Sequence, residues 1–430
     1  MRKLLLIVLI LSCFTASHAQ LASVTNYGTL KVAPQSIDYS ELLNAMQASN
    51  AQNAYERFKN EFVEIEDNPL APTVNDPQKD AMYSKRLKMM ATEIQLPYNN
   101  IVRRYIDLYT RDGGTMEWIL GAARYYFPIF EEALYRYGLP MEFKILPVIE
   151  SALVPYAKSS ASAVGLWQMM ILTGKYYGLE VTSFVDDRCD PVKSSDAACR
   201  YLRDLYRIYG DWTLVLAAYN CGPGNVNKAI KRAGQVRNYW DIWEYLPRET
   251  RSYVPAFIGA TYGYTFQKAH NMTIRTPSYP MAVDTVMVNK MMHLEQVSST
   301  ISVSLDVLRS LNPQYRIDII PAIEHEYPLI LPTASVGKFI DAEMQIYSKD
   351  TVYLKKYLEV KNFSTATAQA VASSSSSGSS RSGATTYKVK NGDVLGKIAD
   401  RYNVRVSDIQ KWNKLKGTMI RPGQSLKIYR

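Results

Sequence analysis

The sequence is poor in the side chains that hold metals. Only four of its 430 residues are histidine, and these are scattered along the chain. Zinc-binding spacings such as a His-Glu-x-x-His helix do not occur, nor does a phosphate-cradling glycine loop behind a strand. We therefore expect neither a metal centre nor a cofactor.

Long apolar runs are also scarce, and the one at residues 4–10 is too short to span a bilayer as a permanent anchor. Two basic residues precede it and Ser17-His18-Ala19-Gln20 follows, which is the order of a secretory signal. The pattern predicts a signal peptide at residues 1–19 and an exported protein of the periplasm or cell envelope. A second interpretation stays open, because Ile10-Leu11-Ser12-Cys13 resembles a lipoprotein box. Lipid on Cys13 would associate the protein with the outer membrane.

Acidic residues are outnumbered by basic ones, and the formal net charge is +10, or about +8 once residues 1–19 are removed. Residues 385–430 carry eleven Lys or Arg against three Asp, an excess equal to that whole surplus. A basic surface attracts polyanions such as nucleic acid, acidic lipid or the carboxylate-bearing cell wall. Export argues against nucleic acid, which leaves acidic lipid and the cell wall as partners.

Cysteine is rare, and three cysteines remain after the signal peptide: Cys189, Cys199 and Cys221. An oxidising compartment permits one disulfide, and Cys189 with Cys199 is the nearest pair in sequence. The alternative is that all three are small buried residues.

The chain is too long for one ordinary hydrophobic core, and its composition and residue pattern change several times along its length. Apolar residues recur at three- and four-residue intervals in residues 99–109 and 116–137, the period of a helix with one buried face. Gly138-Leu139-Pro140 is expected to end the second helix and to begin another that runs to Glu150. Further helices are expected at 193–209, 212–219 and 251–266.

These changes divide the chain into segments. The segments are, in order, the signal peptide (1–19), a helical and irregular extension (20–96), a mostly α domain (97–270), short β-like runs around one helix (275–335), a Ser-rich flexible linker (364–385) and a compact tail (386–430). A weak internal repeat links the last two folded segments: residues 294–312 can be laid on 395–413 without a gap, and both copies end in Asn. Any two short amphipathic helices look alike, so chance similarity is the other explanation.

Glu150 is the first candidate for catalysis. It follows the apolar stretch Ile145-Leu-Pro-Val-Ile149, and apolar surroundings penalise an ionised carboxylate and raise its pKa. A carboxylic acid that holds its proton at neutral pH is what a glycosidic oxygen needs in order to leave. Taken alone, a glutamate at a helix end is more often a solvated surface group.

The residues around Glu150 add context. Glu150-Ser151 is followed by Gly165-Leu-Trp-Gln168-Met-Met170, then by Ala218-Tyr219-Asn220-Cys221-Gly-Pro-Gly224, and then by Glu249-Thr-Arg-Ser-Tyr253-Val-Pro255. In these motifs, over residues 97–270, the sequence strongly resembles the lysozyme-like catalytic domain of lytic murein transglycosylases, specifically the membrane-bound type D group. The resemblance implies a mostly α fold with a lysozyme-like helical catalytic domain.

The resemblance also implies roles for individual residues. Glu150 would act as general acid and then as general base in cleaving the β-1,4 bond between N-acetylmuramic acid and N-acetylglucosamine, with formation of 1,6-anhydromuramic ends. The residues expected to contact the glycan strand are Ser151, Ser159, Gln168, Met170, Tyr219 and Asn220. Trp167 is expected either to stack on sugar or to pack in the core.

A hydrolase normally uses two carboxylates, and Asp186, Asp187, Asp190 and Asp211 are available as the second one. The segment from Asp187 to Pro191 is more simply explained as a loop anchor or a cap of the helix near Lys193. A hydrolysing muramidase therefore stays an alternative, and an inactive wall-binding scaffold is a further one. We expect the enzyme to act as a monomer.

The tail resembles a LysM module in Tyr387-Lys-Val-Lys-Asn-Gly-Asp393 and in Ile420-Arg-Pro-Gly-Gln-Ser-Leu-Lys-Ile428. That resemblance implies a small α+β (βααβ) fold that binds peptidoglycan, with Asn391, Gly392 and Asp393 in the first binding loop. Residues 275–335 would be a divergent second copy. It lacks the Gly-Asp opening, so a structural module packed on the catalytic domain is the favoured role for it.

Overall fold

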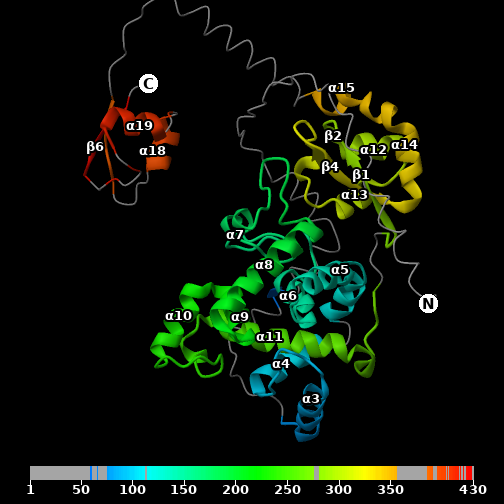
Figure 1. Cartoon of the computed structure of the whole chain (residues 1–430), viewed down its shortest axis with the longest axis vertical. Coiled ribbons are helices and arrows are strands. Elements are labelled where there is room, and N and C mark those ends of the chain that lie inside the picture. Colours follow the sequence, from blue (N-terminus) through cyan, green and yellow to red (C-terminus); the bar gives the residue numbers. More distant parts are fainter. Residues whose placement is uncertain are drawn as a thin grey trace, which may run out of the picture. The chain divides into compact units, whose positions relative to one another are not determined.

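A computed structural model describes residues 59–60, 65, 75–111, 114–275, 280–355, 385–390, 395–402, 404, 406–415, 417, 420 and 423–428 (Figure 1). The signal peptide, Cys13 and nearly all of the Ser-rich linker lie outside these residues. The chain divides into two compact units, residues 1–356 and 357–430. Within the described residues, no helix is both long enough and apolar enough to cross a membrane.

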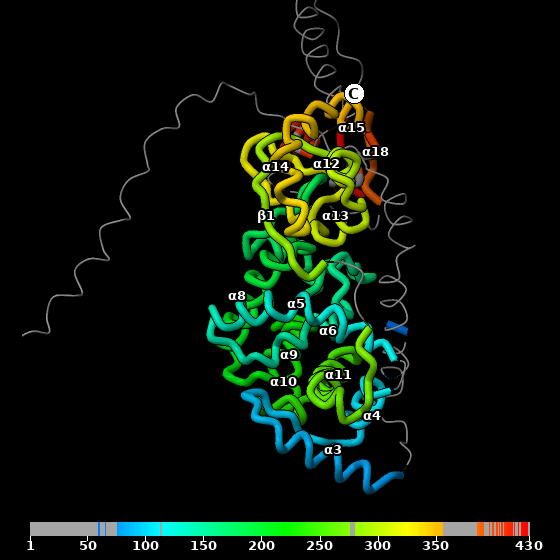
Figure 2. Tube along the Cα trace, turned by 90° about the vertical axis from the view of Figure 1, so that its right-hand side faces the viewer, coloured from blue at the N-terminus to red at the C-terminus, as the bar shows by residue number. Residues whose placement is uncertain are grey.

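The first unit begins with a helical domain, which Figure 2 shows as a bundle around the green helix α11. Its α-helices are α3 (Pro77–Met89), α4 (Asn100–Tyr109), α5 (Thr115–Tyr137), α6 (Leu146–Ser151), α7 (Ile171–Tyr176), α8 (Pro191–Tyr209), α9 (Trp212–Cys221), α10 (Pro223–Arg232) and α11 (Arg248–Thr265). Short 3-10 helices are η1 (Met141–Ile145), η2 (Trp243–Tyr245) and η3 (Gln267–His270).

Helix α11 lies at the centre of this domain. Its glycine residues allow helix α4 to pack closely against it. A Cβ atom on Gly259 would lie 2.6 Å from Cβ of Tyr105 in α4, a distance that real side chains do not adopt. Thirteen of its residues, Thr250 and Ser252–Gly263, are buried. A helix that is buried on nearly all sides must lie in the core.

Most helices predicted from periodicity are present within a few residues of their expected bounds. Asn99 caps α4, and Gly138 ends α5 in a left-handed conformation, φ 60°. The expected continuous helix from Pro140 to Glu150 is wrong: η1 and α6 replace it, with Pro147 in the first turn of α6. Proline lacks the N–H that a helix interior needs, so it begins a new helix here.

The same unit ends in a small α+β module, called here the LysM-like module (residues 280–355). Strand β1 (Val283–Val288) pairs antiparallel with β4 (Tyr327–Pro332), and β2 (Met292–His293) pairs with β3 (Ile319–Ile320). Four helices accompany them, α12 (Leu294–Ile301), α13 (Leu305–Leu311), α14 (Thr333–Tyr347) and α15 (Asp350–Tyr353), together with η4 (Arg316–Asp318). The expectation of one helix is thus wrong, and the module's core continues past residue 335 into Phe339 and Ile346 of α14.

The second unit contains strand β5 (Thr385–Lys388) paired antiparallel with β6 (Ser425–Ile428), and helices α18 (Leu395–Tyr402) and α19 (Val406–Asn413) between them. This βααβ order is the one predicted. Helices α12 and α18 begin at the two residues that the internal repeat aligns.

The repeat is confirmed by its terminal asparagines. Asn312 Nδ2 donates to Leu308 O (2.9 Å) and Ile330 O (2.8 Å), and its Oδ1 accepts from Ile330 N (2.8 Å). Asn413 makes the same three bonds to Ile409 O (2.9 Å), Lys427 O (2.7 Å) and Lys427 N (2.7 Å). Each asparagine therefore joins the second helix of its module to a strand.

Cys189 and Cys199, the pair nearest in sequence, are not joined by a disulfide. Cys189, Cys199 and Cys221 are free thiols, and the first two are buried. The alternative of small buried residues describes these two.

Candidate functional site

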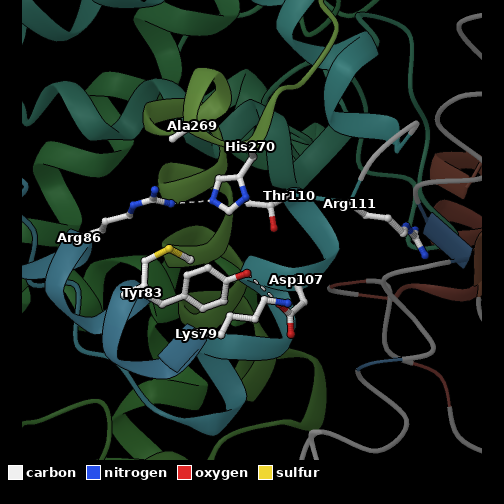
Figure 3. Close-up of a pocket in the computed structure, with 9 residues that line it drawn as sticks. Lys79, Tyr83, Arg86, Asp107, Thr110, Arg111, Ala269 and His270 are labelled. Carbon is white, nitrogen blue, oxygen red and sulfur yellow. Dashed lines mark hydrogen bonds and ion pairs between the residues drawn. The ribbon is translucent and has the colours of Figure 1, made fainter. Parts of the chain in front are cut away.

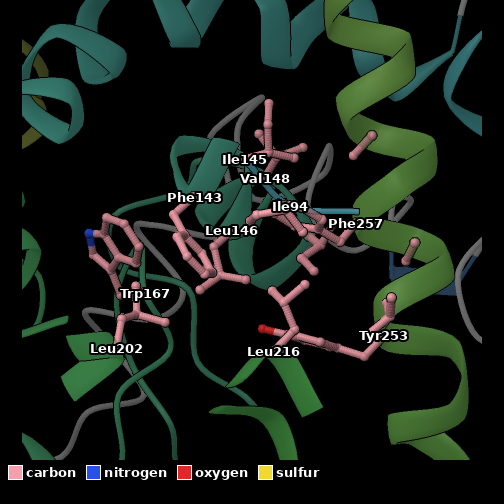
Figure 4. Close-up of a cluster of buried hydrophobic side chains, with 14 of the residues drawn as sticks. Ile94, Phe143, Ile145, Leu146, Val148, Trp167, Leu202, Leu216, Tyr253 and Phe257 are labelled. Atoms are coloured by element: carbon pink, nitrogen blue, oxygen red, sulfur yellow. The ribbon is translucent and has the colours of Figure 1, made fainter. Parts of the chain in front are cut away.

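Glu150 lies near the end of the short helix α6. The chain turns away behind it through Ala152 and Leu153, which adopt left-handed conformations with φ of 49° and 61°. Such conformations are uncommon for residues with side chains, so the surrounding packing must hold the turn. Figure 4 shows that packing: Leu146 and Val148 lie among the buried side chains between Trp167 and helix α11.

The surroundings of Glu150 favour the protonated carboxyl group. Burial raises the pKa of Glu150 to about 8 from an ordinary 4.5. The Tyr253 hydroxyl, which donates a hydrogen bond to Oε1, acts against this rise, and the nearby charge of Glu249 adds to it. Because part of Glu150 stays exposed, the group is a proton-holding acid that a substrate can reach.

The loop of residues 157–170 carries the Gly-Leu-Trp-Gln motif. Hydrogen bonds to its backbone carbonyl oxygens hold it in place. The Ser151 hydroxyl lies 2.9 Å from Leu166 O, and the Tyr219 hydroxyl donates to Trp167 O (2.8 Å). Within the loop, Gln168 Nε2 lies 2.9 Å from the carbonyl oxygens of Ala157 and Gly165. Neighbours of Glu150 thus hold the loop beside it.

The predicted substrate contacts fall into two groups. Ser159, Gln168, Met170, Tyr219 and Asn220 retain exposed surface, and Met170 is the most exposed at 45%. Ser151 is fully buried, and its hydroxyl lies between the carbonyl oxygens of Pro147 and Leu166. The contact predicted for Ser151 does not fit this position, since a side chain without exposed surface cannot touch a glycan.

Other predicted residues have different outcomes. Trp167 is fully buried, and its Nε1 donates to Ser195 Oγ (2.9 Å), so it packs in the core rather than on sugar. Asn391, Gly392 and Asp393 lie outside the described residues.

The four candidate second carboxylates all have partners within the fold. Asp186 pairs with Arg188, and Asp187 pairs with Lys193 (2.9 Å). Asp190 and Asp211 cap α8 and α9 by accepting backbone N–H bonds, as proposed for the segment before Pro191. Among the described residues, no group of three or more His, Cys, Asp or Glu side chains could hold a metal ion.

Two residues close to Glu150 were not among the predicted site residues. Tyr253 of α11, 103 positions away in sequence, donates a hydrogen bond to the Glu150 carboxyl group. The negative charge of Glu249, at the start of the same helix, raises the pKa of Glu150. Glu249 also lies 3.5 Å from Asn220 Nδ2. Both belong to the Glu249–Pro255 motif, which was the available signal.

A pocket of about 460 Å³ lies away from these residues, between α3, α4 and η3 (Figure 3). Its polar groups satisfy one another: Lys79 pairs with Asp107 (2.7 Å), and Arg86 bonds to Tyr262 (2.8 Å) and His270 (3.0 Å). None of the predicted site residues lines it. The pocket's contacts attach α3 to the rest of the domain.

Comparison with family models agrees with this organisation. Residues 127–241 match the Transglycosylase SLT domain, residues 282–348 the "Lytic transglycosylase MltD, LysM-like domain", and residues 387–428 the LysM domain. The 70 kDa soluble lytic transglycosylase of Escherichia coli is a similar solved structure, with 19% identity and a TM-score of 0.31, covering 55% of this chain and 46% of that one.

Two curated relatives are also similar. A "Putative tributyltin chloride resistance protein" of Alteromonas sp. is 36% identical over 94 residues, which are 22% of this chain and 45% of that one. The "Membrane-bound lytic murein transglycosylase D" of Escherichia coli K12 is 30% identical over 337 residues, 77% of this chain and 70% of that one. The chain therefore belongs to the family of membrane-bound lytic murein transglycosylase D and is a peptidoglycan lytic transglycosylase.

Proposed function

We propose that Glu150 cleaves the β-1,4 bond between N-acetylmuramic acid and N-acetylglucosamine, first as an acid and then as a base. The observation that carries this proposal is the raised pKa of a reachable carboxyl group, about 8. Glu150 gives its proton to the leaving glycosidic oxygen. The substrate's N-acetyl group supports the positive charge at the anomeric carbon.

The second step returns the proton. The Glu150 carboxylate, now ionised, takes a proton from the muramic C6 hydroxyl, whose oxygen closes the 1,6-anhydro ring. The enzyme ends as it began, and no water is consumed. Tyr253 supports this step, because its hydroxyl donates to Oε1 of Glu150 and so stabilises the transient carboxylate.

The remaining site residues divide by their exposure. The residues proposed to contact the glycan each keep exposed surface, either in the 157–170 loop or at the end of α9: Ser159, Gln168, Met170, Tyr219 and Asn220. Ser151 is proposed to act as a positioning residue that ties α6 to that loop.

Glu249 gives a specific reason to keep a hydrolysing muramidase as the second candidate. It is the carboxylate whose charge reaches Glu150, whereas the four aspartates considered from sequence serve structural contacts. A second carboxylate near the acid could activate water.

The test is digestion of purified sacculi by the wild type, Glu150→Gln and Glu249→Gln, with mass spectrometry of the products. We expect 1,6-anhydromuramic ends from the wild type and from Glu249→Gln, and no cleavage by Glu150→Gln. Activity in Glu150→Gln would show that another acid does the work. Reducing ends that depend on Glu249 would establish hydrolysis.

The C-terminal LysM module is proposed to hold the enzyme on peptidoglycan through residues that include Asn391, Gly392 and Asp393. Its excess of basic residues suits an anionic wall. We also propose a cell-envelope location, which is supported by the membrane-bound character of the E. coli relative that its name states. Deletion of residues 386–430 should weaken retention on sacculi and spare turnover of short soluble glycans; unchanged retention would contradict the anchor.

A further inference from the structure

We propose that Arg316 of the LysM-like module is a positioning residue for catalysis, which acts through Asp186 and Arg188 on the 157–170 loop. The module would then be part of the catalytic apparatus, whatever its own affinity for sugar. The inference goes beyond the proposed roles of Glu150 and of the C-terminal anchor.

The first step is the insertion of a catalytic-domain segment into the module. Val185, between α7 and α8, is fully buried and belongs to the module's hydrophobic core. It forms an antiparallel bridge with Tyr315. On either side of this bridge, Asp186 N donates to Gln314 O (2.8 Å) and Arg316 N donates to Phe184 O (2.8 Å). The segment therefore cannot move independently of the module.

The second step is a buried charge cluster at the same place. The Asp186 carboxylate, 2% exposed, accepts from Arg188 Nε and Nη2, both at 2.8 Å, and from Arg316 Nη2. Burial works to raise the pKa of Asp186, but the two guanidinium groups outweigh it, and the pKa lies below its ordinary value. One carboxylate thus joins a cation of each domain.

The third step links Arg188 to the loop. Its Nη1 donates to the carbonyl oxygens of Ser162 (3.3 Å) and Met169 (3.2 Å). Its backbone packs against Gly165, where a Cβ would lie only 1.8 Å from Arg188 O. Met169 stands between Gln168 and Met170, two of the proposed substrate contacts.

These contacts determine what loss of Arg316 would do. Asp186 would keep one cation, Arg188, in place of two. A buried carboxylate with fewer donors interacts more strongly with the donor that remains. Arg188 would then be pulled from the two loop carbonyls. Small displacements of groups that position a substrate cost catalysis far more than they cost stability.

The module supplies a matched control in Arg309. Like Arg316, this arginine pairs with a buried aspartate: its Nε and Nη2 donate to Asp318 at 3.0 and 2.7 Å. Both partners lie inside the module. Its ion pairs are with Asp318 and Asp306 rather than with Asp186, although Asp318 lies in η4 two residues from Arg316, so its removal tests what a local disturbance of η4 alone would do.

The experiment measures cleavage of short soluble glycan strands by full-length Arg316→Ala, Arg316→Lys, Arg309→Ala, Asp186→Asn and the Arg316→Ala/Asp186→Asn double variant. We expect kcat to fall about 10-fold or more in Arg316→Ala, to be partly restored in Arg316→Lys, and to stay within about twofold in Arg309→Ala at matched folded fraction. The double variant should be no slower than Asp186→Asn alone, because the two residues act in one chain.

Equal rates in Arg316→Ala and Arg309→Ala, or additive losses in the double variant, would overturn the proposal. If Arg316→Ala does not fold, the comparison of Arg316→Lys with Arg309→Lys decides the same question. The assay counts cleavage events of either product type. Failure of the anhydro mechanism would therefore be seen in the products, and failure of the Arg316 proposal in the rates.

Discussion

Replacing Glu150 with glutamine should make the fold more stable at neutral and alkaline pH while it abolishes activity. The folded chain holds this carboxyl group at a pKa of about 8 against an ordinary value of 4.5. With the raised value in the folded state, the stability is fully present below pH 4.5 and is lost as the pH rises through 8. Relative to its value at low pH, the free energy of unfolding of the wild type is therefore lower by about 3 kcal/mol at pH 7 and by about 5 kcal/mol above pH 8. Glutamine avoids this loss because it cannot ionise and its oxygen can still accept from Tyr253.

The assay is denaturant unfolding of both proteins at pH 4, 7 and 9, followed by circular dichroism. The difference in unfolding free energy should be close to zero at pH 4, reach about 3 kcal/mol at pH 7 and level off above pH 8. Glu326→Gln makes the same chemical change at an exposed position and serves as the control. A difference that stays constant from pH 4 to 9 would refute the reasoning, because it would mean that the fold does not hold the proton on Glu150.

Other predictions concern the neighbours of this group. Tyr253→Phe removes a hydrogen bond to the carboxylate and should raise the pKa of Glu150, while Glu249→Gln removes a negative charge and should lower it. The alkaline limb of the rate against pH should therefore shift up in the first variant and down in the second; shifts in the same direction would contradict this account. Gly165→Ala should lower the free energy of unfolding by about 3 kcal/mol or more. The added Cβ would lie 1.8 Å from Arg188 O, and the backbone at this position has φ of 92°. Thermal unfolding checks this, and an unchanged midpoint would exclude the close approach.

The sequence was enough to predict most of the helical framework. Helices such as α4 and α8 bury apolar faces at the helical period, and Asn99, Asp190 and Gly210 mark their ends. The helix before Glu150 was misjudged because Ile145-Leu-Pro-Val-Ile149 is apolar throughout, so periodicity does not show where one short helix stops. Pro147 marked the break. The LysM-like module was underestimated for a related reason: α12, α13 and α15 have only 8, 7 and 4 residues, and α14 lies almost wholly past residue 335.

The site was predictable only as a set of motifs. The Glu150 motif was found, but its hydrogen bond to Tyr253 joins residues 103 positions apart, and only the packing of α6 on α11 brings them together. Ser151 shows a second limit. A motif records that a residue matters, yet it does not separate residues that touch substrate from those that hold other residues in place. Ser162 in the 157–170 loop has φ of 67°, a conformation in which glycine is favoured, and it lies outside the motifs that indicated the site.

Holding the 157–170 loop by its carbonyl oxygens has a consequence for how this enzyme tolerates mutation. Every residue type presents the same carbonyl group, so many loop side chains are free to vary while the backbone path persists. Apart from Gln168, whose amide lies 2.9 Å from two carbonyl oxygens within the loop, the side chains that hold it come from outside: Ser151, Arg188 and Tyr219. Variation in substrate preference is therefore accessible through the loop's own sequence, and a library confined to its exposed positions should yield folded enzymes.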